Sequence, residues 1–303
     1  MNKISVIITT YNGSKTIEKT LNSIYNQEGL TTHFTLEVFV IDDQSTDQTR
    51  TIVQKFPVNL IVNEKNSGGP NKGRNVGLKR VTGDFICIVD QDDEWLPNRI
   101  LALLPYLNKS LIVTSGFIIK DAIAGNDKVV INNNSSGFVC FEKNSTFLHR
   151  LEKSSTGQNT YLGSIIYSAS LKHIEFEEDY GMVDFDWSLK FFHQQSSIEV
   201  CQALYVRNLD GKNLSMNETY RKNDYDYSLK TIENYKKNYP IQSKRAIKKV
   251  NGTMARYYYS IGNMKQARIY LVKSSLNLKT ILYFLTTFIG SGFVIKRFSV
   301  FGN

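Results

Sequence analysis

The chain has 303 residues, of which 41% are hydrophobic and 21% charged, a composition that is ordinary for a globular protein. It carries 37 Lys or Arg and 28 Asp or Glu, but residues 241–303 hold 11 of the cations and no acidic residue, which leaves 26 basic and 28 acidic groups before them. Because the first 240 residues are nearly neutral, we exclude a nucleic-acid binder, whose binding domain would itself be strongly basic.

The cysteines and the N-terminus indicate the compartment. Cys87, Cys140 and Cys201 lie far apart and form no CxxC pair, so we expect neither a zinc site nor a disulfide framework. Residues 1–6 lack the long apolar run of a secretory signal and are expected to form the first strand. The sequence therefore predicts a cytoplasmic protein in a reducing compartment.

Short apolar runs alternate with helical patterns in the first half of the chain. Ile17, Leu21 and Ile24 form one helical stripe, and the segment 46–56 follows a capping cluster of Ser, Thr and Asp. The apolar runs, which are rich in β-branched residues, predict buried strands at 4–9, 36–41, 58–62 and 85–89. Strands that alternate with helices at this spacing predict an α/β fold with a doubly wound, mostly parallel sheet.

The second half is less regular and then becomes helical. We expect strands, some of them antiparallel edge strands, at 111–119, 128–131, 163–167 and 198–206. Helical patterns follow at 225–239, 242–261 and 264–275. We therefore divide the chain into an α/β domain, residues 1–219, and a basic helical C-terminal appendage, residues 220–303.

Polar residues follow the expected parallel strands, at the edge where ligands bind in such sheets. The segment 41–47 contains Asp42, whose carboxylate could accept a hydrogen bond from the imide N–H of uracil. Its acidic residues could equally cap the following helix. Tyr11 ends the first strand and could stack on a base, although a surface tyrosine is also ordinary.

Three carboxylates stand within four residues at the end of the strand 85–89. Asp90 and Asp92 are two apart, so in an extended segment they would point the same way. A hard divalent cation would relieve the repulsion between the carboxylates, and Mg²⁺ or Mn²⁺ prefers oxygen ligands shared with substrate phosphates. The alternative is a solvated acidic turn ahead of a helix that starts near Pro97.

A glycine-rich loop, residues 66–77, leads into a helix. Its backbone amides, Lys72 and Arg74 could face a phosphate, because helix N-termini and guanidinium groups favour anions. The loop matches neither GxGxxG nor GxxxxGK[ST], which disfavours a dinucleotide enzyme and a P-loop NTPase.

Four of these motifs occur in a characteristic order and spacing. They are Val6 to Asn12, Ile41 to Asp47, Gly73-Arg74-Asn75-Val76-Gly77 and Asp90-Gln91-Asp92-Asp93. Together they resemble the family 2 glycosyltransferases of the GT-A fold over roughly residues 3–215. The resemblance implies a GT-A nucleotide-diphospho-sugar transferase with the helical appendage added to it.

The resemblance also implies roles for individual residues. Asp92 would coordinate Mn²⁺ or Mg²⁺, and the ion would neutralise the charge that grows on the leaving nucleoside diphosphate. Asp90 would approach the ribose or the donor sugar, and Arg74 would lie near the nucleotide. The complete donor-nucleotide site would be Thr10, Tyr11, Asp42, Arg74 and Asp90.

An inverting transfer needs a carboxylate that takes the proton from the attacking hydroxyl. By resemblance this base is Asp184, although the acid that usually precedes it is replaced by Val183. Asp184 could instead cap the next helix. The rivals for the base are Glu178, Asp179 and Asp186. The Tyr-Arg-x-His of the family also lacks its histidine, because Tyr205-Val206-Arg207-Asn208 stands there.

The C-terminal region contains an uncharged, mostly apolar segment, 280–295. At 16 residues it is shorter than the roughly 20 that a helix needs to cross a bilayer. With the surrounding cations it could form an interfacial helix on the inner face of the cell membrane. The alternative is that its apolar face packs on the globular domain or on a second subunit in a homo-oligomer.

The predicted function is a metal-dependent inverting glycosyltransferase in surface polysaccharide biosynthesis. The expected partners are a nucleotide-sugar donor, most simply a UDP-sugar, and a saccharide or lipid-linked saccharide acceptor. The alternative is a catalytically inert, nucleotide-sugar-binding subunit of a larger synthase, which Val183 and the missing histidine suggest.

Overall fold

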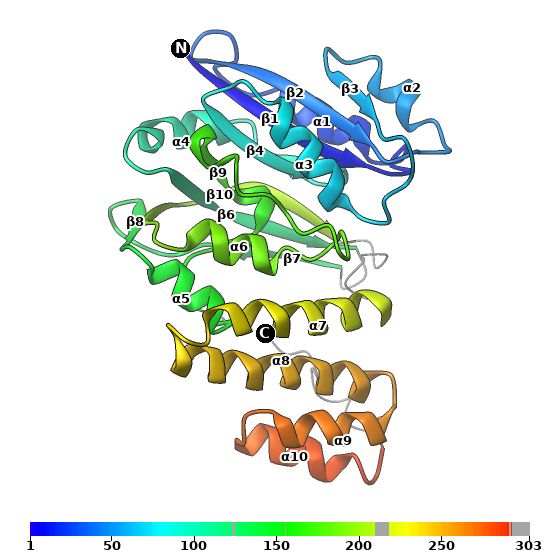
Figure 1. Ribbon diagram of the computed structural model, residues 1–303. Coiled ribbons are helices and arrows are strands. Elements are labelled where there is room, and N and C mark those ends of the chain that lie inside the picture. The colour runs from blue at the N-terminus through cyan, green and yellow to red at the C-terminus, as the bar shows by residue number, and fades with distance from the viewer. Residues whose placement is uncertain (123–124, 155, 210–217, 291, 293–303) are drawn as a thin grey trace. The chain divides into compact units, whose positions relative to one another are not determined.

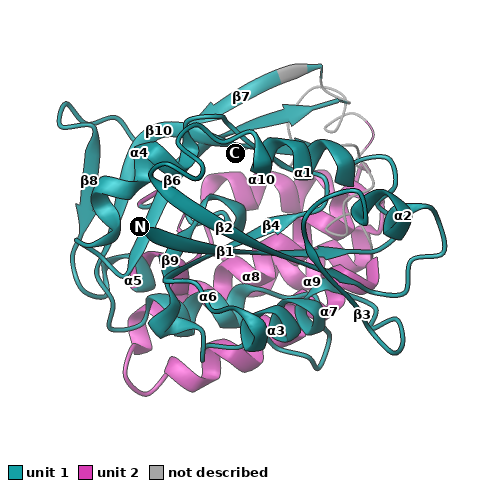
Figure 2. Ribbon diagram, turned by 90° about the horizontal axis from the view of Figure 1, so that it is seen from above, with its two compact units in different colours: residues 1–147, 158–214 teal, residues 148–157, 215–303 magenta. Residues whose placement is uncertain are grey.

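A computed structural model describes residues 1–122, 125–154, 156–209, 218–290 and 292. The chain divides into two compact units, coloured separately in Figure 2. Unit 1 comprises Met1–Phe147 and Gln158–Leu214, and unit 2 comprises Leu148–Gly157 and Ser215–Asn303.

One large sheet dominates the described part of unit 1, and its strands have helices packed beside them (Figure 1). The strand order is β3-β2-β1-β4-β9-β6-β10-β5, with β7 paired to β6 and β8 paired to β10. The strands are β1 (Asn2–Thr10), β2 (Phe34–Asp42), β3 (Asn59–Val62), β4 (Phe85–Asp90), β5 (Glu94–Trp95), β6 (Ile112–Asp121), β7 (Asn126–Val130), β8 (Phe138–Phe141), β9 (Ile166–Ser168) and β10 (Ser197–Leu209). The helices are α1 (Ile17–Tyr25), α2 (Thr49–Val53), α3 (Pro70–Arg80), α4 (Arg99–Leu107), α5 (Ser145–Leu151) and α6 (Phe185–Phe192), and α5 continues into unit 2.

The pairing of the strands confirms the predicted α/β class. Strands β3, β2, β1 and β4 run parallel, and β10 is parallel to β6. Strand β9 is antiparallel to both of its neighbours, and β5, β7 and β8 are antiparallel additions. The register sets Thr10 opposite Asp42 and Thr9 opposite Asp90, so the carboxyl ends of three central strands meet at one edge.

The core of unit 1 forms where apolar residues face both sides of the sheet. Strand β1 is buried from Ile4 to Ile8, as expected for a central parallel strand that is covered on both faces. The stripe on α1 is also confirmed, because Ile17, Leu21 and Ile24 are fully buried in the same apolar cluster as alternate residues of β1.

Two glycines of the glycine-rich segment allow α3 to lie close to β1. A Cβ added at Gly73 would come within 2.8 Å of Thr9 Cγ2, and one added at Gly77 within 2.6 Å of Ile7 Cγ2. Real Cβ atoms do not approach so closely, so these positions exclude larger side chains. Close packing of the helix on the strand therefore explains the glycines at these two positions.

Two predicted elements are shorter in the structure. The helix expected over 46–56 is limited to α2 (Thr49–Val53), because Asp42 Oδ1 accepts a hydrogen bond from Ser45 N and Asn12 Oδ1 accepts one from Thr46 N. These side-chain contacts draw the backbone out of helical geometry. The strand expected over 163–167 begins only at Ile166, since Leu162–Ser164 forms a turn of 3₁₀-helix.

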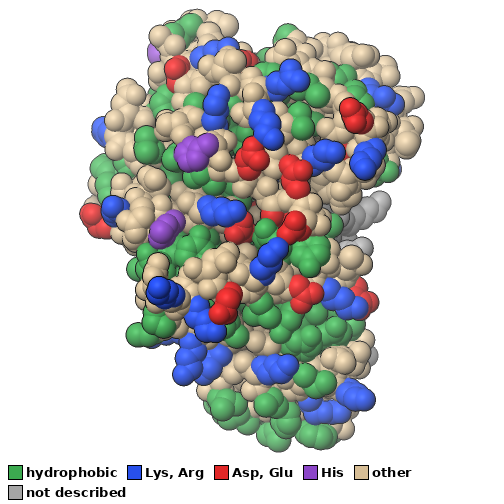
Figure 3. All heavy atoms as spheres, viewed as in Figure 1, with side chains coloured by type: hydrophobic (Ala, Val, Ile, Leu, Met, Phe, Trp, Pro, Cys, Tyr) green, Lys and Arg blue, Asp and Glu red, His purple; other side chains and the backbone are tan. Residues whose placement is uncertain are grey.

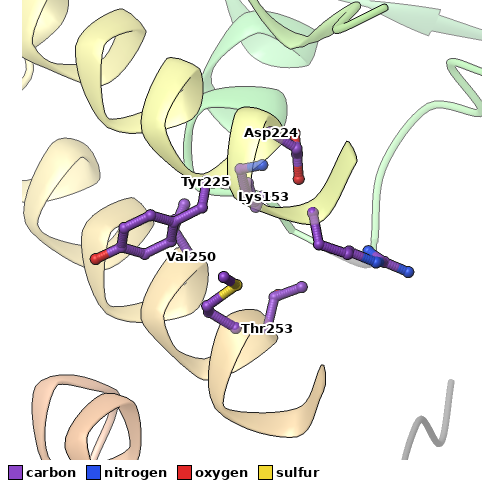
Figure 4. A pocket seen from close by; sticks show the side chains of 7 residues that line it. Lys153, Asp224, Tyr225, Val250 and Thr253 are labelled. Carbon is purple, nitrogen blue, oxygen red and sulfur yellow. The ribbon is translucent and has the colours of Figure 1, made fainter. Parts of the chain in front are cut away.

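Unit 2 is helical in its described part, as predicted. It contains α7 (Glu218–Tyr235), α8 (Pro240–Ser260), α9 (Met264–Lys273) and α10 (Leu278–Thr286). Its core is rich in tyrosine, around Met254, Tyr257, Tyr258, Tyr259 and Ala267. A small pocket of this unit, shown in Figure 4, includes none of the predicted site residues; it is lined by Lys153, Arg221, Asp224, Tyr225, Val250, Thr253 and Met254.

The length of the C-terminal helices decides whether the apolar segment near the C-terminus could cross a bilayer. Helix α10 ends at Thr286, and the part of the predicted 280–295 segment at 291 and 293–295 lies outside the described residues. Among the helices that the structure describes, none combines the length and the apolar character needed to cross a bilayer.

Glu37 joins the amino ends of three strands, at the edge of the sheet away from the predicted site. Its carboxylate accepts hydrogen bonds from Ser5 Oγ at 2.5 Å, Thr82 N at 2.6 Å and Gly83 N at 2.9 Å, and it pairs with Lys3 Nζ at 2.6 Å. Burial alone would raise the pKa of Glu37, but these contacts lower it to about 2.

We expect Glu37→Gln to lower the free energy of unfolding by about 2 kcal/mol at neutral pH, because the new amide group would face N–H donors. The folded-state pKa of Glu37 is depressed from 4.5 to about 2, so its contribution is present above the unfolded value and is lost as the pH falls toward the folded one. Urea unfolding of wild type and Glu37→Gln, at neutral pH and between the two pKa values, measures both the loss of stability and its dependence on pH. The control Glu18→Gln removes an exposed carboxylate in the first turn of α1 and should lower the free energy of unfolding by about 0.5 kcal/mol at most. A difference between wild type and Glu37→Gln that stays constant with pH would contradict the account.

Candidate active site

Asp42 lies at the end of β2 and is fully buried. Its Oδ1 accepts a hydrogen bond from Ser45 N at 2.9 Å, and Arg50 Nε lies 3.9 Å from the same oxygen. Its Oδ2 is buried and, among the described residues, has no hydrogen-bond partner. Because an unsatisfied buried carboxylate oxygen is costly, this atom marks a position where an N–H donor from a ligand would be stabilising.

The strand end beside Asp42 is held by a residue that the sequence analysis did not single out. Gln91 Oε1 accepts hydrogen bonds from Thr10 Oγ1 at 2.5 Å and from Tyr11 N at 3.0 Å. Asp43 N also donates to Thr10 O, at 2.8 Å. The backbone at Tyr11 is therefore fixed while its side chain remains 48% exposed, which leaves the ring available to a ligand.

Asp43 has a structural role, unlike its neighbour Asp42. Its carboxylate accepts hydrogen bonds from Asn63 Nδ2 at 2.7 Å and from Ser67 N at 2.8 Å, and its backbone oxygen accepts one from Asn66 Nδ2. Asp43 therefore fastens the loop after β3 to the end of β2. It does not cap α2, whose N-cap residue is Gln48.

Arg74 is buried on α3 and is paired with the acidic edge. Its Nη2 lies 3.0 Å from Asp90 Oδ1, its Nη1 donates to Asn71 Oδ1 at 3.0 Å, and its guanidinium stacks over the ring of Phe176 at 5.2 Å. The structure thus brings Arg74 and Asp90 together, as two of the predicted site residues. A guanidinium held in this way is rigid, because each contact fixes one side of its plane.

The acidic segment after β4 is a turn, so our premise of an extended segment was wrong. Strand β4 ends at Asp90, and Asp93 N donates to Asp90 O at 3.2 Å. The alternation that would point Asp90 and Asp92 the same way does not apply here. Asp92 is partly buried, and its backbone oxygen accepts a hydrogen bond from Asn208 Nδ2 at 2.7 Å.

Asp93, which the sequence analysis assigned no separate role, is the most buried of these carboxylates. It accepts hydrogen bonds from Tyr161 OH at 2.6 Å, Tyr205 OH at 3.0 Å and Asn208 N at 2.9 Å. Burial first, and then the charges of Asp90 and Asp92, raise the pKa of Asp93 to about 8. The turn is therefore a place where negative charge is poorly tolerated without a cation.

The segment that lacks the family's histidine still reaches this turn. Asn208 donates from its backbone to Asp93 and from its side chain to Asp92 O and to Glu94 Oε1. Arg207 stacks over the ring of Tyr161 at 4.8 Å. The end of β10 therefore contributes an amide and a cation beside the acidic turn, although the histidine of the family is missing there.

The acidic turn fits a metal ion only in part. Among the described residues, no group of three or more His, Cys, Asp or Glu side chains could hold an ion alone. Asp90 is paired with Arg74, and Asp93 accepts hydrogen bonds from Tyr161 and Tyr205, so the assignment of Asp92 as a ligand comes from the resemblance. Mg²⁺ and Mn²⁺ are commonly bound by one or two carboxylates together with substrate phosphates, so this donor set fits an ion that a diphosphate completes.

Asp184 precedes α6 and is exposed. Although it occupies the N-cap position, its side chain makes no capping hydrogen bond, so the capping alternative is wrong for this structure. Two of its rivals are engaged elsewhere: Glu178 Oε1 accepts from Asn75 Nδ2 at 2.7 Å, and buried Asp186 pairs with Lys190 at 2.6 Å.

The loop before Asp184 is organised by Glu177, which sequence reasoning missed. The Glu177 carboxylate accepts hydrogen bonds from the backbone N–H groups of Tyr180, Gly181, Met182 and Val183. Asn71 Nδ2 donates to this carboxylate and also to Val183 O. Since Asn71 accepts from Arg74, a chain of hydrogen bonds runs from the residue before Asp184 to Asp90.

The mostly parallel sheet, with its acidic turn at one edge, has the GT-A fold, which it shares with the crystal structure of S. aureus TarS 1–349. The model of glycosyl transferase family 2 matches residues 5–170, more than half of the chain. The protein therefore belongs to glycosyl transferase family 2, as the resemblance predicted.

Individual relatives match shorter segments. The poly(ribitol-phosphate) β-N-acetylglucosaminyltransferase TarS of Staphylococcus aureus is 52% identical over 97 residues, which is 31% of this chain and 17% of TarS. The UDP-Glc:α-D-GlcNAc-diphosphoundecaprenol β-1,3-glucosyltransferase WfgD of Escherichia coli is 31% identical over 144 residues, 46% of this chain and 52% of WfgD. The aligned segments thus span about half of these relatives or less.

A solved structure confirms the predicted GT-A fold. The crystal structure of S. aureus TarS 1–349 in complex with UDP-GlcNAc superposes with a TM-score of 0.61 at 22% sequence identity. The alignment covers 94% of this chain and 79% of that one, so the likeness extends beyond the segment that the family model matches.

We expect Glu177→Gln to lower the free energy of unfolding by about 2 kcal/mol, because its amide group would face backbone N–H donors inside the loop. Hydrogen exchange at the amides of Tyr180, Gly181, Met182 and Val183 should accelerate in the variant. The control Glu175→Gln removes a more exposed carboxylate near the same loop, paired with Lys79, and should change neither property. Unchanged exchange at these amides in Glu177→Gln would show that the carboxylate does not organise the loop.

Proposed function

We propose that this protein is a metal-dependent inverting glycosyltransferase that moves a sugar from a UDP-sugar to a hydroxyl group of a saccharide or lipid-linked saccharide. The single observation that carries the proposal is the buried, unsatisfied Oδ2 of Asp42, which ends the strand next to β1 while the acidic turn follows β4 on the other side. A uracil imide N–H is a donor that this oxygen could accept.

The donor nucleotide would occupy the carboxyl edge of the sheet. Asp42 would accept from the base, Tyr11 would stack on it, and the fixed backbone at Thr10 would border it. Arg74 and Asp90 would lie toward the ribose and the donor sugar. A UDP-sugar donor is supported by the UDP-GlcNAc that TarS binds and by the UDP-Glc in the name of WfgD.

A Mn²⁺ or Mg²⁺ ion would be held by Asp92 together with the diphosphate of the donor. When bound, the ion supplies positive charge against the charge that develops on the leaving nucleoside diphosphate. Burial, and after it the charges of Asp90 and Asp92, raise the pKa of Asp93, and the two neighbouring charges support a cation at this turn. Asn208 and the end of β10 would hold the turn in place through its backbone.

Asp184 would act as the general base. Its exposed carboxylate would take the proton of the acceptor hydroxyl, and the hydroxyl oxygen would form the new bond to the anomeric carbon while the bond to the diphosphate oxygen breaks. Attack from the face opposite the leaving group inverts the configuration. Glu177 and Asn71 would position the base through the loop that precedes it.

The acceptor class follows from the relatives. The names of TarS and WfgD specify a poly(ribitol-phosphate) and a GlcNAc-diphosphoundecaprenol, a polymer and a lipid-linked saccharide. These names support surface polysaccharide assembly as the process that this protein would serve.

We expect Asp184→Asn to reduce kcat by about a hundredfold or more while the affinity for UDP stays within about twofold, because the amide cannot accept the proton but leaves the donor site intact. UDP release in the presence of acceptor and Mn²⁺ measures the first quantity, and calorimetric titration measures the second. Glu178→Gln and Asp179→Asn remove the neighbouring rival carboxylates and should retain most of the activity.

Three outcomes would contradict parts of this proposal. If Glu178→Gln or Asp179→Asn abolished turnover while Asp184→Asn did not, the base would be misassigned. If the wild-type protein bound UDP-sugars but released no UDP with any acceptor pool, the inert-subunit alternative would hold. Full activity in the presence of EDTA would remove the metal from the mechanism.

We expect the wild-type protein to bind UDP about tenfold or more tightly than CDP, because N3 of cytosine is an acceptor and would face the Asp42 oxygen. Asp42→Asn should bring the ratio of the two affinities close to one, since the amide can accept a hydrogen bond from uracil N3–H and donate one to cytosine N3. Calorimetric titrations of both nucleotides with Mn²⁺ check this, with Glu18→Gln as the control variant. An unchanged ratio in Asp42→Asn would mean that Asp42 does not contact the base.

A further inference from the structure

Helix α10 packs on unit 2 through Tyr283 and Thr286, while most of its large apolar side chains face outward. Thr286 Oγ1 lies 2.7 Å from Tyr259 OH of α8, and Arg268 of α9 donates from Nη1 to Thr287 O at 3.2 Å. Tyr283 packs edge-on against Tyr259, with the ring centroids 5.2 Å apart. None of the residues of α10 is buried. Tyr283 thus reaches the tyrosine-rich core, but most of the apolar side chains of the helix lie outside it.

The outward side carries large apolar residues at helical spacing. These residues are between 47% and 77% exposed, and we call them the apolar surface: Leu278, Ile281, Leu282, Leu285, Phe288 and Ile289. Val272 and Leu276, just before α10 in the chain, are also exposed. Several large apolar side chains exposed on one helix mark a surface that binds a membrane or another protein.

Positive charge accompanies the apolar surface. Between residues 241 and 290 there is no Asp or Glu, and nine cations occur: Lys244, Arg245, Lys248, Lys249, Arg256, Lys265, Arg268, Lys273 and Lys279. Figure 3 shows hydrophobic and basic side chains, and no acidic ones, over the end of unit 2 formed by α9 and α10. This combination is typical of helices that lie in the interface of a bilayer.

The positive charge of residues 241–290 favours a membrane over a second copy of this chain as the partner of the apolar surface. A second copy of this chain would bring cations against cations, because the segment offers no acidic partner. An anionic phospholipid surface complements the charge and accepts the apolar side chains. We propose that unit 2 docks on anionic membranes through the apolar surface and the neighbouring lysines, with α10 lying in the plane of the interface.

This docking does not depend on the glycosyl transfer proposed above, but it would bring the enzyme to lipid-linked acceptors. The helix is nine residues long, so it would lie at the interface and not cross the bilayer. The attraction would combine insertion of the apolar surface with the charges of residues such as Lys273 and Lys279, and salt should weaken it.

Co-sedimentation of the full chain with lipid vesicles tests the proposal. We expect at least about tenfold tighter binding to phosphatidylcholine vesicles that contain about one third phosphatidylglycerol than to pure phosphatidylcholine, and loss of most binding in about 0.5 M NaCl. The paired substitution Leu282→Glu with Leu285→Glu should reduce binding to the anionic vesicles by about tenfold or more.

Two further variants serve as controls. Thr51→Glu with Gln54→Glu adds the same charge to exposed positions of unit 1 and should reduce binding by less than about twofold. Lys265→Gln with Lys273→Gln and Lys279→Gln leaves the apolar surface intact and should weaken binding to the anionic vesicles alone. Circular dichroism and UDP titration establish that each variant is folded, so a loss of lipid binding is separate from a failure of the donor site.

The proposal is overturned if the wild-type chain binds neither type of vesicle, or if the Leu282→Glu, Leu285→Glu variant binds as tightly as the wild type. It is also overturned if this variant changes only the oligomeric mass measured by light scattering, because the apolar surface would then contact a second copy.

Discussion

The candidate site depends on one chain of hydrogen bonds anchored by the pairing of buried Arg74 with partly exposed Asp90. Arg74 joins the end of β4 to α3, and Asn71 continues the chain to the loop that Glu177 holds in front of Asp184. Because α3 can lie against β1 only with glycine at 73 and 77, the packing of the helix sets the distance between the two halves of the site. A donor-binding edge and a candidate base are thereby linked without direct contact between them.

A second constraint is electrostatic. The sheet directs Asp42, Asp90 and the turn that follows to one edge, where burial and mutual repulsion make negative charge costly. Arg74 and the hydroxyl groups of Tyr161 and Tyr205 offset part of this cost, because they donate hydrogen bonds to Asp90 and Asp93. A ligand that brings a cation and an N–H donor would offset the rest of this cost. A metal-bound uridine diphosphate has both features.

Much of the fold could be predicted from the sequence, because strand burial and helix periodicity are local signals. The strands around β1 and the stripe of α1 are examples. The roles of Gln91, Asp93 and Glu177 could not be predicted, since their partners lie far away in the sequence or are backbone N–H groups. The assumption of alternating side chains failed at Asp92 because a turn, and not a strand, follows Asp90. Helix α2 was overestimated because Asp42 and Asn12 hold the preceding backbone.

The central claim is that a uracil N–H and a metal-bound diphosphate occupy this edge of the sheet. A crystal structure of the protein with UDP and Mn²⁺ tests it most directly. The account predicts the base N3–H on Asp42 Oδ2, the tyrosine ring of Tyr11 against the base and the ion beside Asp92. Well-ordered nucleotide and ion at any other place on the molecule would contradict it.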